Sequence, residues 1–447
     1  MPCFWLIFVA LSSTRQKNKM NFIKELRWRG LINRTSIGEE QLSPGLENEL
    51  QERTICAYIG YDPTAPSLTI GNLVTVMLLK HLQLAGHKPI VLLGGATGKI
   101  GDPSEKDTER SLKTYAELAS NRDHLREQFI KLLNAEGENA ALILDNADFY
   151  KNMDVFTFLR DIGKSITVNY MMAKDSVKSR LNSSTGISFT EFSYQVIQAY
   201  DFQYLYQHHN CILQMGGSDQ WGNITSGTHL IGKSGGKGYG LTCPLLLKRD
   251  GTKFGKSTSG NIWLDPQMTS PYKFYQFWLN VDDGDLPKLW RIFSLKTKAA
   301  IETLERENPQ VQKRELAREL TTRIHSEQDY EKVLKATQIV FNTKLKAPLI
   351  QKLSSDELDM LSREIPSKIV DKKDLIKGVG LLNFLVGAHE SLNSKNGVRR
   401  AIQGAALVLN GIKITDDKMI INADNLLHGR YLFMQNGRKN KFILVAE

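Results

Sequence analysis

The first strong pattern along the chain is an apolar run from Ile55 to Ile59, followed by a polar turn and by apolar positions at helical spacing from Gly71 to about Gly86. A second segment begins at Lys88, is apolar from Pro89 to Leu93, and ends in a glycine-rich turn, residues 94–101. This order predicts a strand, a helix and a second strand that is parallel to the first. Because ligands of parallel sheets bind at the carboxyl ends of the strands, we expect both turns to lie at a binding site.

The alternation of strand and helix patterns continues to about residue 270. One stretch departs from it, because Pro103–Arg126 is rich in charged and small polar side chains, including Lys106 and Arg110. We interpret this stretch as a mobile loop over the site. The further elements predicted by the alternation are strands at Ala140–Asp145, Cys211–Met215 and Leu241–Leu247, and helices at Val155–Lys164 and Glu191–Gln207.

Apolar residues recur at three- and four-residue steps from about Pro271 to Thr343, as in Ala317–Ile324, which predicts a separate helical domain. A polar connection, Ser354–Lys373, leads to a third region. There Asn410-Gly411 and Asn436-Gly437 each stand between apolar runs, a pattern that indicates β-hairpins.

A short helical pattern ahead of these hairpins carries Lys395, Arg399 and Arg400. Small, basic and mixed in structure, this region is typical of an RNA-binding module, with a solvated dimerisation domain as the alternative. The predicted organisation is an extension at 1–19, an α/β domain at 20–270, a helical domain at 271–350, a linker at 351–374 and the small module at 375–447.

The charge composition of the chain indicates the kind of partner that it binds. The 447 residues have a formal net charge of +10 and a sequence pI near 9.2, which favours an anionic partner such as RNA. The four cysteines lack the spacing of a zinc site, so we expect reduced thiols and no metal.

The first nineteen residues are apolar and then basic, and the first acidic residue of the chain is Glu25. No apolar run is long enough to span a membrane. An acid-poor, basic N-terminus is typical of a mitochondrial targeting extension, and we favour the mitochondrial matrix as location. The alternative is the cytoplasm of a bacterium, with translation starting at Met20.

Two segments invite a phosphate-binding interpretation. Residues 227–234 match the pattern G-x-x-x-x-G-K-S, but we reject it because that loop needs a strand before it and a helix after it, whereas polar and glycine-rich sequence surrounds this one. Lys253 and Lys256 stand on a polar segment with a glycine between them. Such a flexible cationic arm can follow a polyphosphate as its charge redistributes.

Several motifs together resemble those of bacterial-type tyrosyl-tRNA synthetases, and the similarity runs in order from about Met20 to the C-terminus. They are Tyr58–Thr64 with Thr69–Asn72, Gly94–Pro103, Tyr194–Asp201, Gly216–Asn223 and Lys253–Ser257. The resemblance implies an α/β fold, with a class I synthetase Rossmann-like parallel-sheet catalytic domain, an α-helical domain and a small α+β RNA-binding module. It also implies a homodimer that charges tRNA(Tyr) with L-tyrosine, using ATP as co-substrate with Mg²⁺ and no tightly bound cofactor.

The resemblance assigns roles to individual residues. It places Tyr58 and Asp201 against the phenolic hydroxyl of tyrosine, Asp102, Tyr194 and Gln198 against its ammonium, and Gln220 on its carboxylate side. It gives the ribose and backbone of ATP to Gly60, Asp62, Gly217 and Asp219, and the phosphates to Thr64, Thr69, Asn72, Lys106, Arg110, Lys253 and Lys256. Tyr194, Gln198 and Asp201 are spaced for one face of a helix.

The departure from the family pattern is at 69–72, where the usual His-x-Gly-His is Thr69-Ile-Gly-Asn72. Asn72 can donate through its amide and Thr69 through its hydroxyl, but neither carries charge. We expect an active enzyme in which Thr64, Thr69 and the Lys253/Lys256 arm share the phosphate contacts. The implied reaction, attack of the tyrosine carboxylate on the α-phosphorus, needs positioning and charge stabilisation rather than a protein nucleophile.

Two other functions fit parts of the sequence. A tryptophanyl-tRNA synthetase would share the fold and reaction, but the Tyr58/Asp201 pair and the C-terminal module argue against it. A purely structural RNA-binding protein would explain the altered 69–72 motif, yet it would not explain so many retained polar residues at the predicted site.

Overall fold

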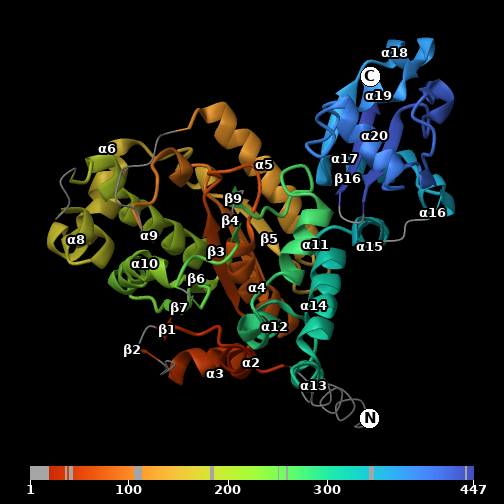
Figure 1. The fold of residues 1–447 in the computed structure, drawn as a ribbon. Coiled ribbons are helices and arrows are strands. Elements are labelled where there is room, and N and C mark those ends of the chain that lie inside the picture. The colour runs from red at the N-terminus through yellow and green to blue at the C-terminus, as the bar shows by residue number, and fades with distance from the viewer. Residues whose placement is uncertain are drawn as a thin grey trace, which may run out of the picture. The chain divides into compact units, whose positions relative to one another are not determined.

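The computed structural model describes residues 20–35, 38–39, 44–104, 113–181, 186–249, 251–257, 260–341, 347–437 and 440–447. The predicted extension 1–19 and the predicted phosphate ligands Lys106 and Arg110 lie outside these residues. Contacts within the chain define two compact units (Figure 1). The first contains the described residues up to Thr269 with Leu279–Leu320, and the second contains Ser270–Trp278 and Thr321–Glu447.

A seven-stranded sheet forms the centre of the first unit, in the order β2-β1-β7-β6-β3-β4-β5. Its strands are β1 (Arg34–Thr35), β2 (Gly38–Glu39), β3 (Cys56–Tyr61), β4 (Lys88–Leu93), β5 (Leu142–Asp145), β6 (Cys211–Gly217) and β7 (Tyr239–Cys243). Strands β3 to β7 pair in parallel, which confirms the predicted strand–helix–strand unit. The chain builds the sheet outward from β3 to β5 and then returns to the other side of β3, so the strand order reverses between β3 and β6.

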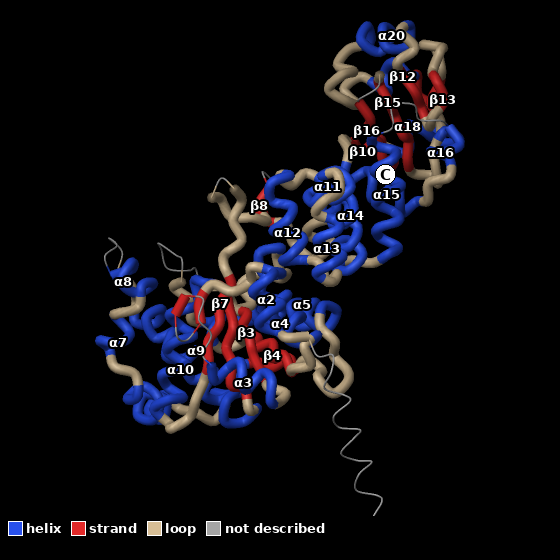
Figure 2. Tube along the Cα trace, turned by 90° about the horizontal axis from the view of Figure 1, so that it is seen from below, coloured by secondary structure: helices blue, strands red, loops and turns tan. Residues whose placement is uncertain are grey.

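Helices cover both faces of this sheet. Helices α4 (Ile70–Leu84) and α5 (Tyr115–Leu132) flank one face, and α9 (Phe189–His209) and α10 (Trp221–Lys233) flank the other, as Figure 1 and Figure 2 both show. Tyr58, Phe202, Cys211 and Ile231 pack in one buried cluster between the sheet and the second pair of helices. The other helices of this unit are α2 (Phe22–Arg29), α3 (Pro44–Glu52), α6 (Val155–Thr157), α7 (Val168–Met172), α8 (Asp175–Leu181), α12 (Leu286–Phe293) and α13 (Lys298–Leu304).

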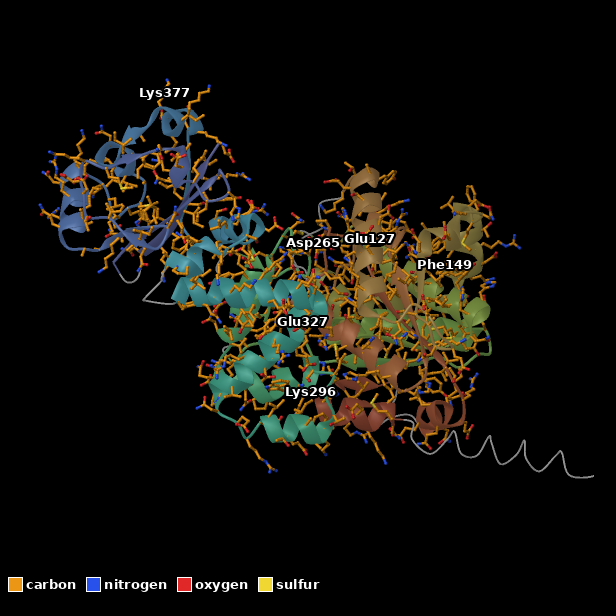
Figure 3. All side chains as sticks on the ribbon, turned by 90° about the vertical axis from the view of Figure 1, so that its right-hand side faces the viewer. Glu127, Phe149, Asp265, Lys296, Glu327 and Lys377 are labelled. Atoms are coloured by element: carbon orange, nitrogen blue, oxygen red, sulfur yellow. The ribbon has the colours of Figure 1, made fainter. Side chains whose placement is uncertain are left out.

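The prediction of a loop from Pro103 to Arg126 is wrong for its second part, because α5 begins directly after Thr114. Thr114 and Glu117 form a capping box, in which each side chain accepts a hydrogen bond from the backbone N–H of the other residue. Phe129 is fully buried, whereas Glu127 is exposed on another face of the same helix (Figure 3). The charged residues therefore form the solvent face of an amphipathic helix, and polarity alone did not reveal it.

Two further elements differ in detail from the prediction. The predicted helix Val155–Lys164 starts as α6 and continues as a π-helical turn, Phe158–Ile162, and a 3₁₀ turn. The last strand ends at Cys243 rather than at Leu247. Residues 227–233 form the second half of α10, which confirms that this stretch is not a phosphate-binding loop.

The second unit contains a five-stranded sheet in the order β10-β16-β15-β12-β13. Both predicted hairpins are present, and Asn410 and Gly411 have the positive φ values, 48° and 80°, that a type I′ turn requires. The strands are β10 (Ser367–Val370), β12 (Leu407–Leu409), β13 (Ile412–Lys413), β15 (Tyr431–Asn436) and β16 (Asn440–Ala446), with a separate pair of β11 (Val379–Gly380) and β14 (Ile420–Ile421).

The helices of the second unit include the predicted basic helix, α20 (Lys395–Gln403). The others are α15 (Glu327–Phe341), α16 (Ala347–Gln351), α17 (Ser355–Glu364), α18 (Lys372–Lys377) and α19 (Leu381–Leu385). Two helices cross the border between the units, α11 (Pro271–Leu279) and α14 (Pro309–Ile324). None of the helices in the described part of the chain combines the length and apolar composition needed to cross a bilayer.

The predicted linker 351–374 contains regular structure. Helix α17 begins with a capping box of Ser354 and Glu357, and β10 pairs in parallel with β16. The predicted helical domain is divided, since α15 belongs to the second unit and α12 and α13 to the first. The compact units thus divide the chain differently from the predicted functional domains, whose limits stay a prediction.

Candidate active site

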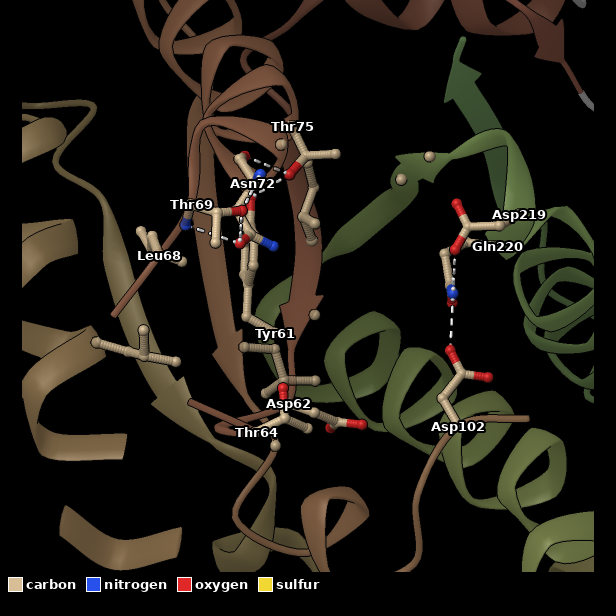
Figure 4. Close-up of a pocket in the computed structure, with 18 of the residues that line it drawn as sticks. Tyr61, Asp62, Thr64, Leu68, Thr69, Asn72, Thr75, Asp102, Asp219 and Gln220 are labelled. Atoms are coloured by element: carbon tan, nitrogen blue, oxygen red, sulfur yellow. Dashed lines mark hydrogen bonds between the residues drawn. The ribbon is translucent and has the colours of Figure 1, made fainter. Parts of the chain in front are cut away.

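A cavity of about 500 Å³ opens at the carboxyl edge of the sheet, beside the point where the strand order reverses. Its lining comes from the ends of β3 and β6, the glycine turn after β4, the start of α4, one face of α9 and the segment after β7 (Figure 4). The predicted site residues that line it are Tyr58, Gly60, Asp62, Thr64, Thr69, Asn72, Asp102, Tyr194, Gln198, Asp201, Gly217, Asp219, Gln220 and Lys253. The Lys256 side chain, Lys106 and Arg110 are outside the described atoms.

One end of the cavity is deeply buried and contains Tyr58 and Asp201, which are 0% and 1% exposed. The Tyr58 hydroxyl makes no hydrogen bond within the described structure. Burial first, and the charge of Asp201 second, raise the pKa of Tyr58 well above its ordinary value, so this hydroxyl stays protonated. The pair therefore offers an unused donor next to a carboxylate acceptor.

Two side chains hold the Asp201 carboxylate. Asn146 donates from Nδ2 to Oδ2 at 2.9 Å, and the Tyr150 hydroxyl lies 2.7 Å from Oδ1. Burial raises the pKa of Asp201 to about 8, although both of these hydrogen bonds act in the opposite direction. Asp201 thus changes its charge near neutral pH.

A chain of hydrogen bonds connects this buried end with Asp62, at the carboxyl end of β3. Asn146 also donates to Thr97 Oγ1 at 3.0 Å, and Thr97 donates to Asp62 Oδ1 at 2.6 Å. Tyr194 donates to Asp62 Oδ2 at 2.8 Å. Since the Tyr194 proton is engaged with Asp62, its oxygen lone pairs remain to accept a hydrogen bond from a ligand.

A second carboxylate, Asp102, stands opposite this chain. Gln220 donates to Asp102 Oδ2 at 2.7 Å (Figure 4). The backbone N–H of Ser104 donates to Asp102 Oδ1 at 3.0 Å. Gln198 lines the same cavity with its Oε1 buried and without a hydrogen-bond donor in the described structure. Asp102, Tyr194 and Gln198 are all acceptors, as an ammonium group requires.

Thr69 and Asn72 form the N-terminal cap of α4. Thr69 donates to Asn72 Oδ1 from its backbone N–H at 3.0 Å and from its hydroxyl at 2.8 Å (Figure 4). The backbone N–H of Asn72 in turn donates to Thr69 Oγ1 at 3.4 Å. The Thr69 proton is thus engaged inside the cap, while Asn72 Nδ2 has no acceptor among the described residues. The contacts of both side chains with phosphate stay a prediction.

The segment after β7 lies directly against this cap. Ile70 N–H donates to the Ile262 carbonyl at 3.1 Å, and Ile262 N–H donates to the Gly255 carbonyl at 2.9 Å. This pairing brings the Lys253–Ser257 arm beside the positive end of a 15-residue helix. The arrangement gathers positive potential at the end of the cavity that contains the start of α4, where an anion would be stabilised.

Asn146 and Tyr150 were not predicted as site residues. Asn146 directly follows β5, so the rule that ligands bind at strand carboxyl ends is a signal that could have found it. Tyr150 stands four residues further on, in a 3₁₀ turn, and nothing in the local sequence indicates that it reaches Asp201.

Known proteins share this fold and sequence. Residues 50–345 match the family of tRNA synthetases class I (W and Y), and residues 357–445 match the tyrosine–tRNA ligase SYY-like C-terminal domain. A tyrosine–tRNA ligase of Parabacteroides distasonis is 47% identical over 439 residues, covering 96% of this chain and 100% of that protein. One of Cytophaga hutchinsonii is 48% identical over 436 residues, covering 95% and 99%.

A solved structure is similar as well. The crystal structure of a C-terminally truncated mitochondrial tyrosyl-tRNA synthetase of Coccidioides posadasii matches with a TM-score of 0.63 at 28% identity, covering 74% of this chain and 98% of that one. This protein is a class I aminoacyl-tRNA synthetase, because the family model matches most of the chain and the strand order of the parallel sheet reverses beside the cavity. The chain belongs to the tyrosine–tRNA ligase family, since relatives with that name are 47% and 48% identical in sequence over nearly their full length. The resemblance found in the sequence is thereby confirmed.

Proposed function

We propose that this chain activates L-tyrosine with ATP, forming tyrosyl-adenylate and pyrophosphate, and then transfers the tyrosyl group to the terminal adenosine of tRNA(Tyr). The single observation that carries the choice of amino acid is the buried Tyr58 hydroxyl beside Asp201, for which no described residue provides a hydrogen-bond partner. A buried unpartnered hydroxyl costs about 1–3 kcal/mol. A ligand whose phenolic oxygen accepts from Tyr58 and whose proton goes to Asp201 removes that cost.

Other amino acids do not satisfy the same pair. Phenylalanine leaves both polar groups without partners, and the indole of tryptophan has a donor but no acceptor for the Tyr58 proton. The family that matches includes enzymes for both tryptophan and tyrosine, so the pocket decides between them. The Tyr58/Asp201 pair supports tyrosine.

The other end of the amino acid has matching groups. An α-ammonium in the cavity has three acceptors, namely Asp102, the Tyr194 oxygen and Gln198 Oε1. Gln220, fixed by its hydrogen bond to Asp102, faces the carboxylate side. Held at both ends, the tyrosine carboxylate can attack the α-phosphorus without a protein nucleophile, since well-oriented reactants gain effective molarities of about 10⁵–10⁸ M.

The nucleotide fits the opposite wall. Gly60, Gly217 and Asp219 offer backbone and carboxylate contacts to the ribose, and Asp62, which directly follows β3, joins them in the lining of the cavity. ATP enters as its magnesium complex, and the ion is bound mainly by phosphate oxygens and water. The residues we assign to the phosphates are Thr64, Asn72, Lys106, Arg110, Lys253 and Lys256, with Thr69 acting through the cap that orients Asn72.

The tRNA needs a second, basic surface, and α20 fits this need. Val398 and Ile402 are buried, whereas Lys395, Arg399 and Arg400 are exposed. We assign this helix to contacts with tRNA phosphates. The match of residues 357–445 to the C-terminal domain of tyrosine–tRNA ligases supports the assignment.

We also propose that the enzyme is a homodimer. Large apolar side chains stand exposed along consecutive elements after β5, and Phe156 and Phe189 are 78% and 77% exposed. Apolar patches of this kind are rare on monomers and mark contact surfaces. The family resemblance implies that a second copy of the chain covers these side chains. We call them the α6–α9 patch, which consists of Val155, Phe156, Leu159, Val168, Met172, Leu181 and Phe189.

The setting that we propose is bacterial translation. The basic N-terminus favours the mitochondrial matrix, but the curated relatives at 47% and 48% identity are bacterial, whereas the fungal mitochondrial protein is 28% identical. A reporter fused to residues 1–19 tests the choice in isolated mitochondria. We expect no import, and efficient import would support the matrix instead.

The charging reaction tests the function as a whole. The enzyme is incubated with total tRNA, ATP and all twenty amino acids, and the esterified amino acid is identified by mass spectrometry. We expect tyrosine on tRNA(Tyr) alone. Tryptophan on tRNA would contradict the interpretation of the pocket.

A further inference from the structure

Tyr150 lies behind Asp201 with respect to the cavity. Asp201 and Asn146 line the cavity, but Tyr150 does not. The Tyr150 hydroxyl and the Asn146 amide each hold one oxygen of the Asp201 carboxylate, at 2.7 and 2.9 Å. Both donors belong to the same short turn after β5, so this turn fixes the plane of the carboxylate.

The Tyr150 hydroxyl has one proton and two acceptors. Besides Asp201 Oδ1, the Ile197 carbonyl oxygen lies at 2.9 Å. When Asp201 is ionised, Tyr150 donates to it. When Asp201 is protonated, its carboxyl group can donate to the Tyr150 oxygen while Tyr150 donates to Ile197. Both arrangements satisfy these three groups, so Tyr150 accommodates either charge state of Asp201.

Packing holds this hydroxyl in place. The Tyr150 ring lies 5.4 Å from the Tyr200 ring and 6.4 Å from the Phe158 ring, measured between centroids. Burial, followed by the nearby charge of Asp201, raises the pKa of Tyr150 well above its ordinary value, so the phenol stays a donor. Such a preorganised donor strengthens a buried charge without moving.

We propose that Tyr150 is a positioning residue that determines specificity for the phenolic hydroxyl of the substrate, because its own hydroxyl fixes and stabilises the ionised Asp201 that accepts the substrate proton. Nothing in the pocket besides Asn146 serves Asp201 in the same way within the described residues. The inference rests on the proposed recognition of tyrosine by Tyr58 and Asp201.

The proposal predicts a pH dependence. The titratable groups facing Asp201 are the carboxyls of Asp62 and Asp145 and the phenols of Tyr58, Tyr150, Tyr194 and Tyr200. The three phenols nearest the cavity stay neutral because burial raises their pKa values. Discrimination between tyrosine and phenylalanine should therefore rise with pH as Asp201 ionises, near its pKa of about 8.

The test is Tyr150→Phe, which removes one oxygen atom and keeps the ring. Tyr204→Phe is the matched control, because Tyr204 belongs to the same aromatic cluster but forms no hydrogen bond to Asp201. For each protein, kcat/KM for tyrosine and for phenylalanine is measured by pyrophosphate exchange between pH 6.5 and 9. The ratio of the two isolates the phenol contact, since both substrates share the α-ammonium.

We expect Tyr150→Phe to lower the tyrosine-to-phenylalanine ratio about tenfold, mainly through KM for tyrosine, which corresponds to about 1.4 kcal/mol. The pH midpoint of the ratio should move upward, because ionised Asp201 loses a donor. Tyr204→Phe should behave as wild type. An unchanged shift of the thermal midpoint by ATP shows that each variant is folded.

A Tyr150→Phe enzyme with the wild-type ratio and the wild-type midpoint would overturn the proposal. An equal loss with both substrates would do so too, since it indicates a general structural effect. If wild type itself shows no tyrosine-dependent exchange, the proposed function fails first, and the inference fails with it.

Discussion

Thr69 and Asn72 hold each other across the first turn of α4, with the Thr69 hydroxyl donating to Asn72 Oδ1 at 2.8 Å. The pair occupies the positions of the two histidines in the family pattern. Because Thr69 fixes the amide oxygen, the Asn72 nitrogen keeps a constant orientation. One residue therefore positions the other, and of these two side chains only Asn72 keeps a donor available for a ligand.

Substitutions at position 72 separate the cap from the donor. Asn72→Asp keeps both acceptor contacts of the cap but has no side-chain N–H, so the thermal midpoint should stay and the adenylation rate should fall by about 10²–10³. Asn72→Ala should lose both the rate and about 1 kcal/mol of stability. Single-turnover adenylation and thermal melting measure the two effects. An Asn72→Asp enzyme with the wild-type rate would show that this amide does not act on phosphate.

At position 69, Thr69→His restores the family residue. The rate of adenylation should rise or stay unchanged, while α4 loses its N-terminal side-chain cap and the thermal midpoint falls. A large fall in rate would show that the phosphate site is built around the cap itself.

Tyr58→Phe removes the unpartnered buried hydroxyl. We expect the tyrosine-to-phenylalanine ratio of kcat/KM to fall about tenfold, while folding is unchanged or slightly stabilised because a buried unsatisfied group disappears. Tyr204→Phe serves as the control. Full discrimination in Tyr58→Phe would exclude the hydroxyl from recognition.

Asp201 makes stability depend on pH. Its pKa is raised by burial from 3.8 in the reference state to about 8, so the folded, ligand-free protein binds more protons than the unfolded chain between these values. The free energy of unfolding should therefore fall as pH rises through this window, by up to about 1.4 kcal/mol per pH unit from this group.

Asp201→Asn should remove that contribution, so that the variant gains stability over wild type as pH increases from 5 to 8. An asparagine amide can donate to the Tyr150 oxygen while Tyr150 donates to Ile197, as in the protonated wild type. Chemical denaturation at several pH values measures the difference. A constant difference across the window would contradict the raised pKa.

We expect the side chains of the α6–α9 patch to be buried in a dimer interface. Phe156→Glu places a charge in an exposed apolar surface, and we expect the sedimenting species to change from dimer to monomer, with little change in fold. Phe341→Glu is the control, since Phe341 is also exposed, at 64%, but lies in α15 outside the patch. A wild-type protein that sediments as a monomer would refute the homodimer.

Contacts between α20 and tRNA should appear in the salt dependence of binding. Arg400→Ala removes an exposed cation, so the affinity for tRNA should fall and the slope of log affinity against log salt should shrink by about one. Lys131→Ala, on the exposed face of α5, should leave both unchanged. Equal effects of the two variants would point to nonspecific attraction only.

Local sequence patterns predicted the parts of the fold that depend on neighbouring residues. The unit β3-α4-β4 and both asparagine–glycine hairpins follow from apolar runs and turn residues within a few positions. The sequence pattern did not predict helix α5, because few of its residues are buried and its cap, Thr114 with Glu117, lies inside a charged stretch.

The site divides in the same way. The positions of the strand ends, together with the family resemblance, predicted many residues that line the cavity. They did not predict the hydrogen bonds between these residues. That Tyr150 reaches Asp201 depends on how a turn after β5 packs on α9, 51 positions further along the chain. The engagement of the Thr69 hydroxyl in the cap is likewise a matter of side-chain geometry, which residue identity alone does not give.

Pyrophosphate exchange into ATP tests the central claim most directly. The protein, beginning at Met20, is given ATP with tyrosine, phenylalanine or tryptophan in separate reactions. The account predicts exchange with tyrosine, little with phenylalanine and none with tryptophan. Folded, tRNA-binding protein that supports no exchange with tyrosine would contradict it and favour a structural RNA-binding role instead.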